Sequence, residues 1–221
     1  MSIYYQDDHV TLYHGNCLTE HREWLDADVL VTDPPYGIAY RDLKGVSVSG
    51  DIDTNVRDAA LAAWSSDKPS IAFGTWKADR PSGVRQVGIW DKCDQLVPGA
   101  MLPVAGSHEE FYLMGQWPKL TPGGRVREGG NPSRRGSVFR VPGYNPASSE
   151  RPDHPTPKPP TLMMQLVALC PPGIIADPFA GSGATLLAAR NLGRKAIGVE
   201  LEEKYCEIIA KRLSQGAFDF A

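Results

Sequence analysis

The 221-residue sequence predicts an α/β fold with a doubly wound, mostly parallel sheet. The clearest indication is a regular alternation of helical and apolar, strand-like segments beyond residue 160. A second indication is a glycine-rich turn between one of those strands and the helix that follows it. The expected elements are a helix over 161–169, a strand over 174–176, a helix over 185–191, a strand over 196–199 and a helix over 202–213.

The first half of the chain is expected to complete the same sheet, because neither half alone has enough strands to bury both faces. Alternating residues around Asp7 and Asp8 predict a hairpin, and Pro34 and Pro35 end an apolar run because they cannot continue a helix or a central strand. The expected elements are a hairpin over 4–13, a helical stretch over 20–25, strands over 28–32, 70–74, 86–90 and 110–115, and a helix over 56–64.

Composition excludes several classes of protein. The chain is 42% hydrophobic and 22% charged, and no apolar run approaches the roughly 20 residues of a membrane helix, which indicates one globular domain over 1–221. The start of the sequence resembles no secretory signal, so we expect a cytoplasmic protein. The four cysteines form no C-x-x-C pair and the histidines show no ligand spacing, so neither disulfides nor a metal site are predicted.

Charge is distributed unevenly along the chain. The net charge is −3, but residues 119–160 carry eight basic and three acidic residues, which leaves −8 on the rest of the chain. The same segment holds nine prolines and six glycines, so no long regular element is expected in it. A basic, irregular segment suits contact with phosphates of nucleic acid, although a solvated linker would have the same composition.

The run from Asp177 to Thr185 is the strongest local signal. Gly181 and Gly183 allow a tight turn and close approach of a ligand, and the helix that follows favours a negative group at its start. A dinucleotide fold would place a third glycine where Leu186 stands, so the pattern argues against a nicotinamide site. Glu200 ends the next strand, where it could accept hydrogen bonds from ribose hydroxyls or simply be an exposed carboxylate at a helix start.

The run Asp33-Pro34-Pro35-Tyr36 lies at the carboxyl end of a predicted strand, where open α/β sheets bind ligands. It offers a carboxylate and a rigidly held backbone carbonyl, both of which are hydrogen-bond acceptors, followed by an aromatic ring. Two acceptors can bind an NH2 group, and Tyr36 can stack on the planar ring that carries that group. A proline turn capped by an aspartate is the structural alternative.

Together these motifs resemble the amino-group DNA methyltransferases that use S-adenosylmethionine, in the permuted (beta) class whose catalytic motif precedes the cofactor motif. The catalytic motif matches 33–36, the cofactor loop 177–185, the ribose strand 198–200, and the element leading into the first cofactor helix 154–159. Weaker matches are 15–17, 89–92 and 108–109. The resemblance implies a Rossmann-like fold with a target-recognition insertion over 119–153 and a loop over 37–55 that closes on an extruded base.

The resemblance also assigns roles to individual residues, with S-adenosylmethionine as the cofactor. The catalytic residues expected are Asp33, Pro34, Pro35 and Tyr36. The cofactor-binding residues expected are Asp177, Phe179, Ala180, Gly181, Ser182, Gly183, Thr185, Glu200, Thr156 and Lys158. The DNA-binding residues expected are Arg41, Lys44, Arg125, Arg127, Arg134, Arg135 and Arg140.

The expected reaction is methylation of an exocyclic amine in double-stranded DNA, with adenine N6 favoured. Cytosine N4 is the alternative, because its amine presents the same two hydrogens, but cytosine members more often have serine in place of Asp33. Methylation of protein glutamine or RNA usually places the cofactor loop first, and a catalytically inactive DNA-binding subunit generally lacks one of the two motifs. The class also implies a homodimer and a separately acting restriction endonuclease.

Overall fold

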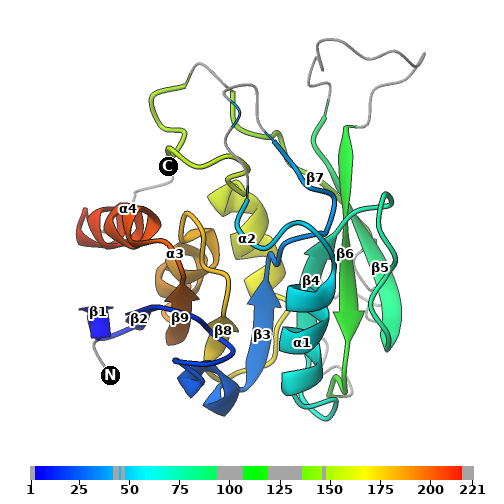
Figure 1. Ribbon diagram of the computed structural model, residues 1–221, viewed down its shortest axis with the longest axis horizontal. Coiled ribbons are helices and arrows are strands. Elements are labelled where there is room, and N and C mark those ends of the chain that lie inside the picture. Colours follow the sequence, from blue (N-terminus) through cyan, green and yellow to red (C-terminus); the bar gives the residue numbers. More distant parts are fainter. Residues whose placement is uncertain are drawn as a thin grey trace, which may run out of the picture.

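The computed structural model describes residues 3–41, 45, 48–93, 107–118, 136–145 and 148–215. Nine strands form one sheet in the order β1-β2-β9-β8-β3-β4-β6-β5-β7 (Figure 1). The strands are β1 (Ile3–Gln6), β2 (Val10–His14), β3 (Val29–Thr32), β4 (Ser70–Gly74), β5 (Val84–Asp91), β6 (His108–Met114), β7 (Val138–Arg140), β8 (Ile175–Asp177) and β9 (Ala196–Glu200).

The sheet is parallel through its centre, with antiparallel pairs on both sides of this central part. Strands β2, β9, β8, β3 and β4 run parallel, while β1 pairs antiparallel with β2, and β6 pairs antiparallel with both β4 and β5. Connections leave β3 and β8 in opposite directions along the sheet, so these adjacent strands form its topological switch point. The predicted doubly wound, mostly parallel sheet is confirmed.

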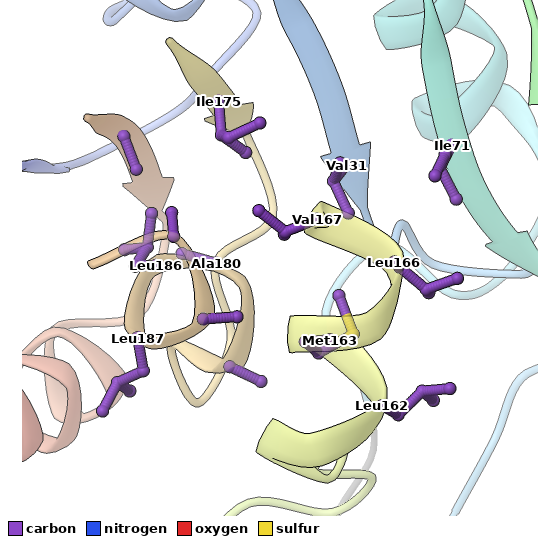
Figure 2. Packing of buried hydrophobic residues seen from close by; sticks show 14 of the residues in the cluster. Val31, Ile71, Leu162, Met163, Leu166, Val167, Ile175, Ala180, Leu186 and Leu187 are labelled. Atoms are coloured by element: carbon purple, nitrogen blue, oxygen red, sulfur yellow. The ribbon is translucent and has the colours of Figure 1, made fainter. Parts of the chain in front are cut away.

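Helices cover both faces of the sheet. They are α1 (Asn55–Ala63), α2 (Pro160–Val167), α3 (Ala184–Asn191) and α4 (Glu203–Ser214), with a 3-10 helix at Glu23–Asp26. Val31, Ile71 and Ile175 point to the face that α2 and α3 cover, where Leu166 and Val167 pack against them (Figure 2). Leu30, Ala176 and Val199 point to the opposite face, in a cluster with Trp24 of the 3-10 helix and with Ala60 and Trp64 at α1. Both faces of the central strands are therefore buried, as a parallel sheet requires.

Most expected elements occur within a few residues of their predicted bounds. The stretch expected to be helical over 20–25 is a single 3-10 helix at Glu23–Asp26. Sequence analysis did not anticipate β7, which has three residues and pairs in parallel with β5 through Ile89 and Val138. A strand that short leaves little periodicity to detect, and it lies in the segment expected to hold no long regular element. No helix in the described part of the chain is long and apolar enough to cross a membrane.

Candidate active site

The two predicted motifs meet where β3 and β8 end side by side. Asp33 follows β3 directly, Asp177 ends β8, and the Thr32 hydroxyl donates to Asp177 Oδ1 at 2.7 Å. Both carboxylates line one cavity of about 680 Å³. The other lining residues among the predicted sites are Pro34, Pro35, Tyr36, Thr156, Lys158, Phe179, Ala180, Gly181, Ser182, Thr185 and Glu200. One motif from each half of the chain thus lines the same cavity.

One end of the cavity, which we call the Glu200 end, is formed by the turn after β8. Gly181 and Gly183 have φ of +52° and +79°, a backbone conformation that favours glycine. A Cβ on Gly183 would lie 2.9 Å from Ile209, and one on Gly181 would lie 3.1 Å from the His154 ring, which also lines the cavity. Both glycines are needed for the turn to pass this close to its neighbours.

Glu200 fixes this turn from the end of β9. Its Oε2 accepts the Gly181 N–H at 2.7 Å, and its Oε1 accepts the Glu202 N–H at 2.9 Å. Burial raises the pKa of Glu200 to about 7, even though both backbone bonds favour the charged form. Burial likewise raises the pKa of Asp177 to about 6, against its bond from Thr32. Each Glu200 oxygen has one backbone donor and can accept a further hydrogen bond.

The Glu200 end fits S-adenosylmethionine. Glu200 offers acceptors for ribose hydroxyls, and Phe179 offers an aromatic surface beside them. The glycine turn brings backbone close to the same space, as an approaching methionine moiety requires. His154 packs against Tyr205 in the wall, and burial, together with Lys158 and Arg151, lowers its pKa to about 4, so its ring is neutral there at pH 7.

The other end of the cavity, the Asp33 end, has a different construction. Asp33 Oδ2 lies 2.5 Å from the Lys158 ammonium, and Asp33 Oδ1 accepts the Tyr36 hydroxyl at 2.6 Å. Glu109 of β6 lies on the far side of both donors, with its Oε2 3.2 Å from Lys158 Nζ and 3.0 Å from the Tyr36 hydroxyl. Lys92, just after β5, lies 2.5 Å from Glu109 Oε1. The charges of the two carboxylates are thus cancelled by those of the two ammonium groups.

The charges at the Asp33 end determine each other's ionisation. Burial raises the pKa of Glu109, but Lys158 and Lys92 outweigh it and lower that pKa to about 2. Burial also raises the pKa of Asp33, Glu109 adds to the rise, and Lys158 opposes it. Burial works against the Lys158 ammonium, yet Asp33 and Glu109 raise its pKa. At neutral pH Glu109 and Lys158 are therefore charged partners.

Sequence analysis did not identify this cluster. It assigned Lys158 to the cofactor, whereas the structure places the Lys158 ammonium on Asp33, so its contact with a cofactor stays a prediction. Glu109 and Lys92 occurred only within weak family matches. The available signal was their position at the ends of β6 and β5 near the same sheet edge as Asp33, which requires knowing the strand order.

The loop that follows Tyr36 reaches the Glu200 end. Asp51 accepts the backbone N–H groups of Gly37 and Tyr40, each at 2.7 Å, and is buried. The Ser49 hydroxyl donates to Glu202 Oε1 at 2.7 Å. Through this bond the described part of the 37–55 loop joins the two ends of the cavity.

The predicted DNA-binding residues are only partly described. Arg41 is exposed and belongs to the described part of the 37–55 loop. Arg140 ends β7 with its side chain 80% exposed, and its Nε lies 3.3 Å from Asp91. The predictions for Lys44, Arg125, Arg127, Arg134 and Arg135 fall outside the described residues.

Comparisons with known proteins point to one family. Residues 84–211, more than half of the chain, match the family model described as DNA methylase, N6_N4_Mtase. YubD of Escherichia coli (strain K12), which bears the name of a methylase, is 28% identical over 204 residues, covering 85% of this chain and 82% of that protein. Type II methyltransferase M.ScaI of Streptomyces caespitosus is 40% identical over 77 residues, which cover 34% of this chain and 25% of M.ScaI.

Solved structures share the fold. The M1.HpyAVI–SAM complex superposes with a TM-score of 0.66 at 19% identity, covering 92% of this chain and 98% of that one. The cytosine-N4-specific PvuII DNA methyltransferase superposes with a TM-score of 0.69 at 15% identity, covering 95% of this chain and 88% of that one. At these identities the similarity concerns the arrangement of the sheet and helices.

Proposed function

Because this chain belongs to the N6/N4 amino-group DNA methylase family and uses S-adenosylmethionine, we propose that it methylates the N6 amine of adenine in double-stranded DNA. The supporting observation is that Asp33 and Glu200 line the same cavity. A substrate amine and a cofactor that share one cavity can be held in line for transfer.

Asp33 and the Pro34 carbonyl are the acceptors for the amine. A nucleobase amine is a weak nucleophile because its lone pair is delocalised into the ring. Two acceptors that each bind one N–H hold the nitrogen so that its lone pair points along the reaction axis. Pro35 restricts the backbone at Pro34, so the carbonyl is rigidly held.

S-adenosylmethionine supplies the methyl group as an electrophilic carbon on a sulfonium. Glu200 and the glycine turn hold the cofactor at the far end of the cavity, where their hydrogen bonds fix its position. The Asp33 carboxylate stabilises the positive charge that develops on the amine nitrogen, and its proximity makes it the group that can take the proton released from that nitrogen.

The target amine is stacked inside a duplex, so the base has to leave the helix to reach Asp33. Extrusion costs a few kcal/mol, which stacking on the Tyr36 ring offsets in part. Tyr36 lines the cavity beside Asp33, and its hydroxyl lies within hydrogen-bond distance of the Asp33 and Glu109 carboxylates. Exposed Arg41 and Arg140 are proposed to contact phosphates around the opening.

Adenine is favoured over cytosine by the carboxylate at position 33, on the family tendency described above. The test is incubation of the protein with unmethylated genomic DNA and S-adenosylmethionine, followed by nucleoside mass spectrometry. We expect N6-methyladenine, formed by wild type and not by Asp33→Ala. N4-methylcytosine alone would show that the alternative target is the correct one, and no methylated nucleoside would contradict the proposed function.

A further inference from the structure

Each oxygen of Asp33 has a donor from another side chain of the protein. Oδ1 accepts the Tyr36 hydroxyl at 2.6 Å, and Oδ2 contacts the Lys158 ammonium at 2.5 Å. Each of these oxygens can accept a further hydrogen bond, but the Lys158 ammonium offsets the negative charge with which Asp33 is proposed to stabilise the positive charge on the amine nitrogen. Asp33 therefore serves the proposed reaction better when Lys158 pairs with another carboxylate.

Glu109 offers that place. Its Oε2 is 3.2 Å from Lys158 Nζ and 3.0 Å from the Tyr36 hydroxyl, so both donors already lie within reach of a second carboxylate. Rotation of the hydroxyl hydrogen moves the Tyr36 bond from Asp33 to Glu109 without moving the ring. Lys158 and Glu109 already form an ion pair, and a shift of a few tenths of an ångström shortens it to the usual length of a charge-assisted hydrogen bond.

The surroundings of Lys158 leave it few other partners. Its side chain is 5% exposed, and its ammonium lies 4.9 Å from the centre of the Phe73 ring. A buried ammonium that lost Asp33 without gaining another carboxylate would be left unpaired, which is strongly unfavourable. Lys92 holds Glu109 from the opposite side at 2.5 Å, so the acceptor stays in position while the donors change.

We propose that Glu109 is a positioning residue that takes over Lys158 and the Tyr36 hydroxyl when the target amine binds Asp33. The exchange frees Asp33 for the amine and keeps every buried charge paired. No covalent bond changes in it, since only hydrogen-bond partners are exchanged. This inference rests on the proposed function, because the incoming group is a base amine.

The exchange predicts an unusual relation between two variants. Glu109→Gln removes the charge that receives Lys158, so Lys158 stays on Asp33 and methyl transfer slows, by about 10- to 100-fold. Adding Lys158→Met to Glu109→Gln removes the competing donor and should restore part of the rate, about fivefold or more over Glu109→Gln alone. If Glu109 only supported the fold, the double variant would be slower than either single variant.

The matched control is Glu110→Gln. Glu110 is the next residue of β6 and is also buried, but it faces the other side of the sheet, where it pairs with Arg80 and accepts the Tyr112 hydroxyl. Its loss should leave the kcat and the KM for DNA within about twofold of wild type, since it touches neither Asp33 nor Lys158. Calorimetric titration with S-adenosylmethionine checks that every variant is folded.

The experiment measures kcat and KM on unmethylated DNA for wild type, Glu109→Gln, Lys158→Met, the double variant and the control Glu110→Gln. Partial recovery in the double variant, with unchanged cofactor affinity, is the expected result. If Glu109→Gln fails to bind cofactor, Glu109→Asn enters the same cycle with the same expectation. A double variant as slow as Glu109→Gln, or slower, would overturn the inference and leave the proposed function intact. An inactive wild type would overturn both.

Discussion

The two ends of the cavity hold carboxylates by different means. At the Glu200 end, backbone N–H groups bind the carboxylate, and no ammonium or guanidinium among the described residues lies within ion-pair distance of it. At the Asp33 end, Lys158 and Lys92 pair with Asp33 and Glu109. The carboxylate of Glu200 is thus available to a neutral ligand's hydroxyls without an ionic partner, whereas the charge of Asp33 is offset by Lys158. We infer that cofactor binding needs little rearrangement, and that methyl transfer at Asp33 is favoured when Lys158 moves to Glu109.

The largest expected effect is at Asp33. Asp33→Ala removes the acceptor that we propose stabilises charge on the amine, and methyl transfer should fall by about 10²- to 10³-fold or more. The fold should persist, because Asp33 lies on a turn outside the strands. Asp33→Ser keeps a neutral acceptor and should retain some activity. The measurement is incorporation of labelled methyl groups into DNA, and wild-type turnover in Asp33→Ala would contradict the assignment.

Substitutions at the Glu200 end should act on cofactor affinity instead. Glu200→Ala removes acceptors for ribose hydroxyls and Phe179→Ala removes an aromatic surface, so each should weaken S-adenosylmethionine binding by about 1–3 kcal/mol. Calorimetric titration of each purified variant measures this change. Unchanged affinity for S-adenosylmethionine in both variants would show that the cofactor binds to another part of the protein.

The free energy of unfolding should also depend on pH, because of the Glu200 carboxyl. The Glu200 carboxyl has an ordinary pKa of 4.5, and burial raises it to about 7 in the folded protein. Between these pH values the folded state holds a proton that the unfolded chain has released. The free energy of unfolding should therefore fall as the pH rises from 4.5 to 7, by about 1–3 kcal/mol from this group.

Glu200→Gln has no titrating carboxyl, so its free energy of unfolding should fall less over this pH range. Asp177 contributes in the same sense, because burial raises its pKa to about 6, and this contribution remains in the variant. Urea unfolding of the cofactor-free protein at several pH values measures the difference. Identical pH dependence in wild type and Glu200→Gln would show that Glu200 titrates normally.

The smallest effect is expected outside the cavity, beyond the Asp33 end. If the exposed Arg140 contacts a phosphate, Arg140→Ala should weaken binding to all DNA sequences alike and lower the salt slope by about one unit. Arg85 lies near the opposite end of β5 and donates to the Gly115 carbonyl, so Arg85→Ala is the matched control. Equal salt slopes for wild type and Arg140→Ala would show that Arg140 does not contact a DNA phosphate.

The difference between the Glu200 end and the Asp33 end also explains which parts of the site could be predicted from the sequence. The Glu200 end is formed by residues close together in the chain, so glycine spacing and strand–turn–helix order were enough to find it. The Asp33 end joins groups from β3, β5, β6 and the segment before α2, and Lys158 is 125 positions from Asp33. Local patterns contain no information on such pairings, because strand order decides them.

The fold was predictable for a related reason. Periodic apolar residues marked the central strands and the helices that bury them, as at β4, whose predicted and observed bounds agree. The pairing of β7 with β5 was not predictable, since a three-residue strand in a proline-rich segment is defined by its partner rather than by its own sequence.

We expect the two ends of the cavity to bind different molecules. The most direct test measures methyl transfer by Glu200→Ala and Asp33→Ala as the concentration of S-adenosylmethionine is raised to saturation. Saturation should restore most activity to Glu200→Ala, which has lost cofactor affinity, and none to Asp33→Ala, which has lost the acceptor for the amine. Restoration of Asp33→Ala by excess cofactor, or a Glu200→Ala variant that stays inactive at saturation, would contradict this account.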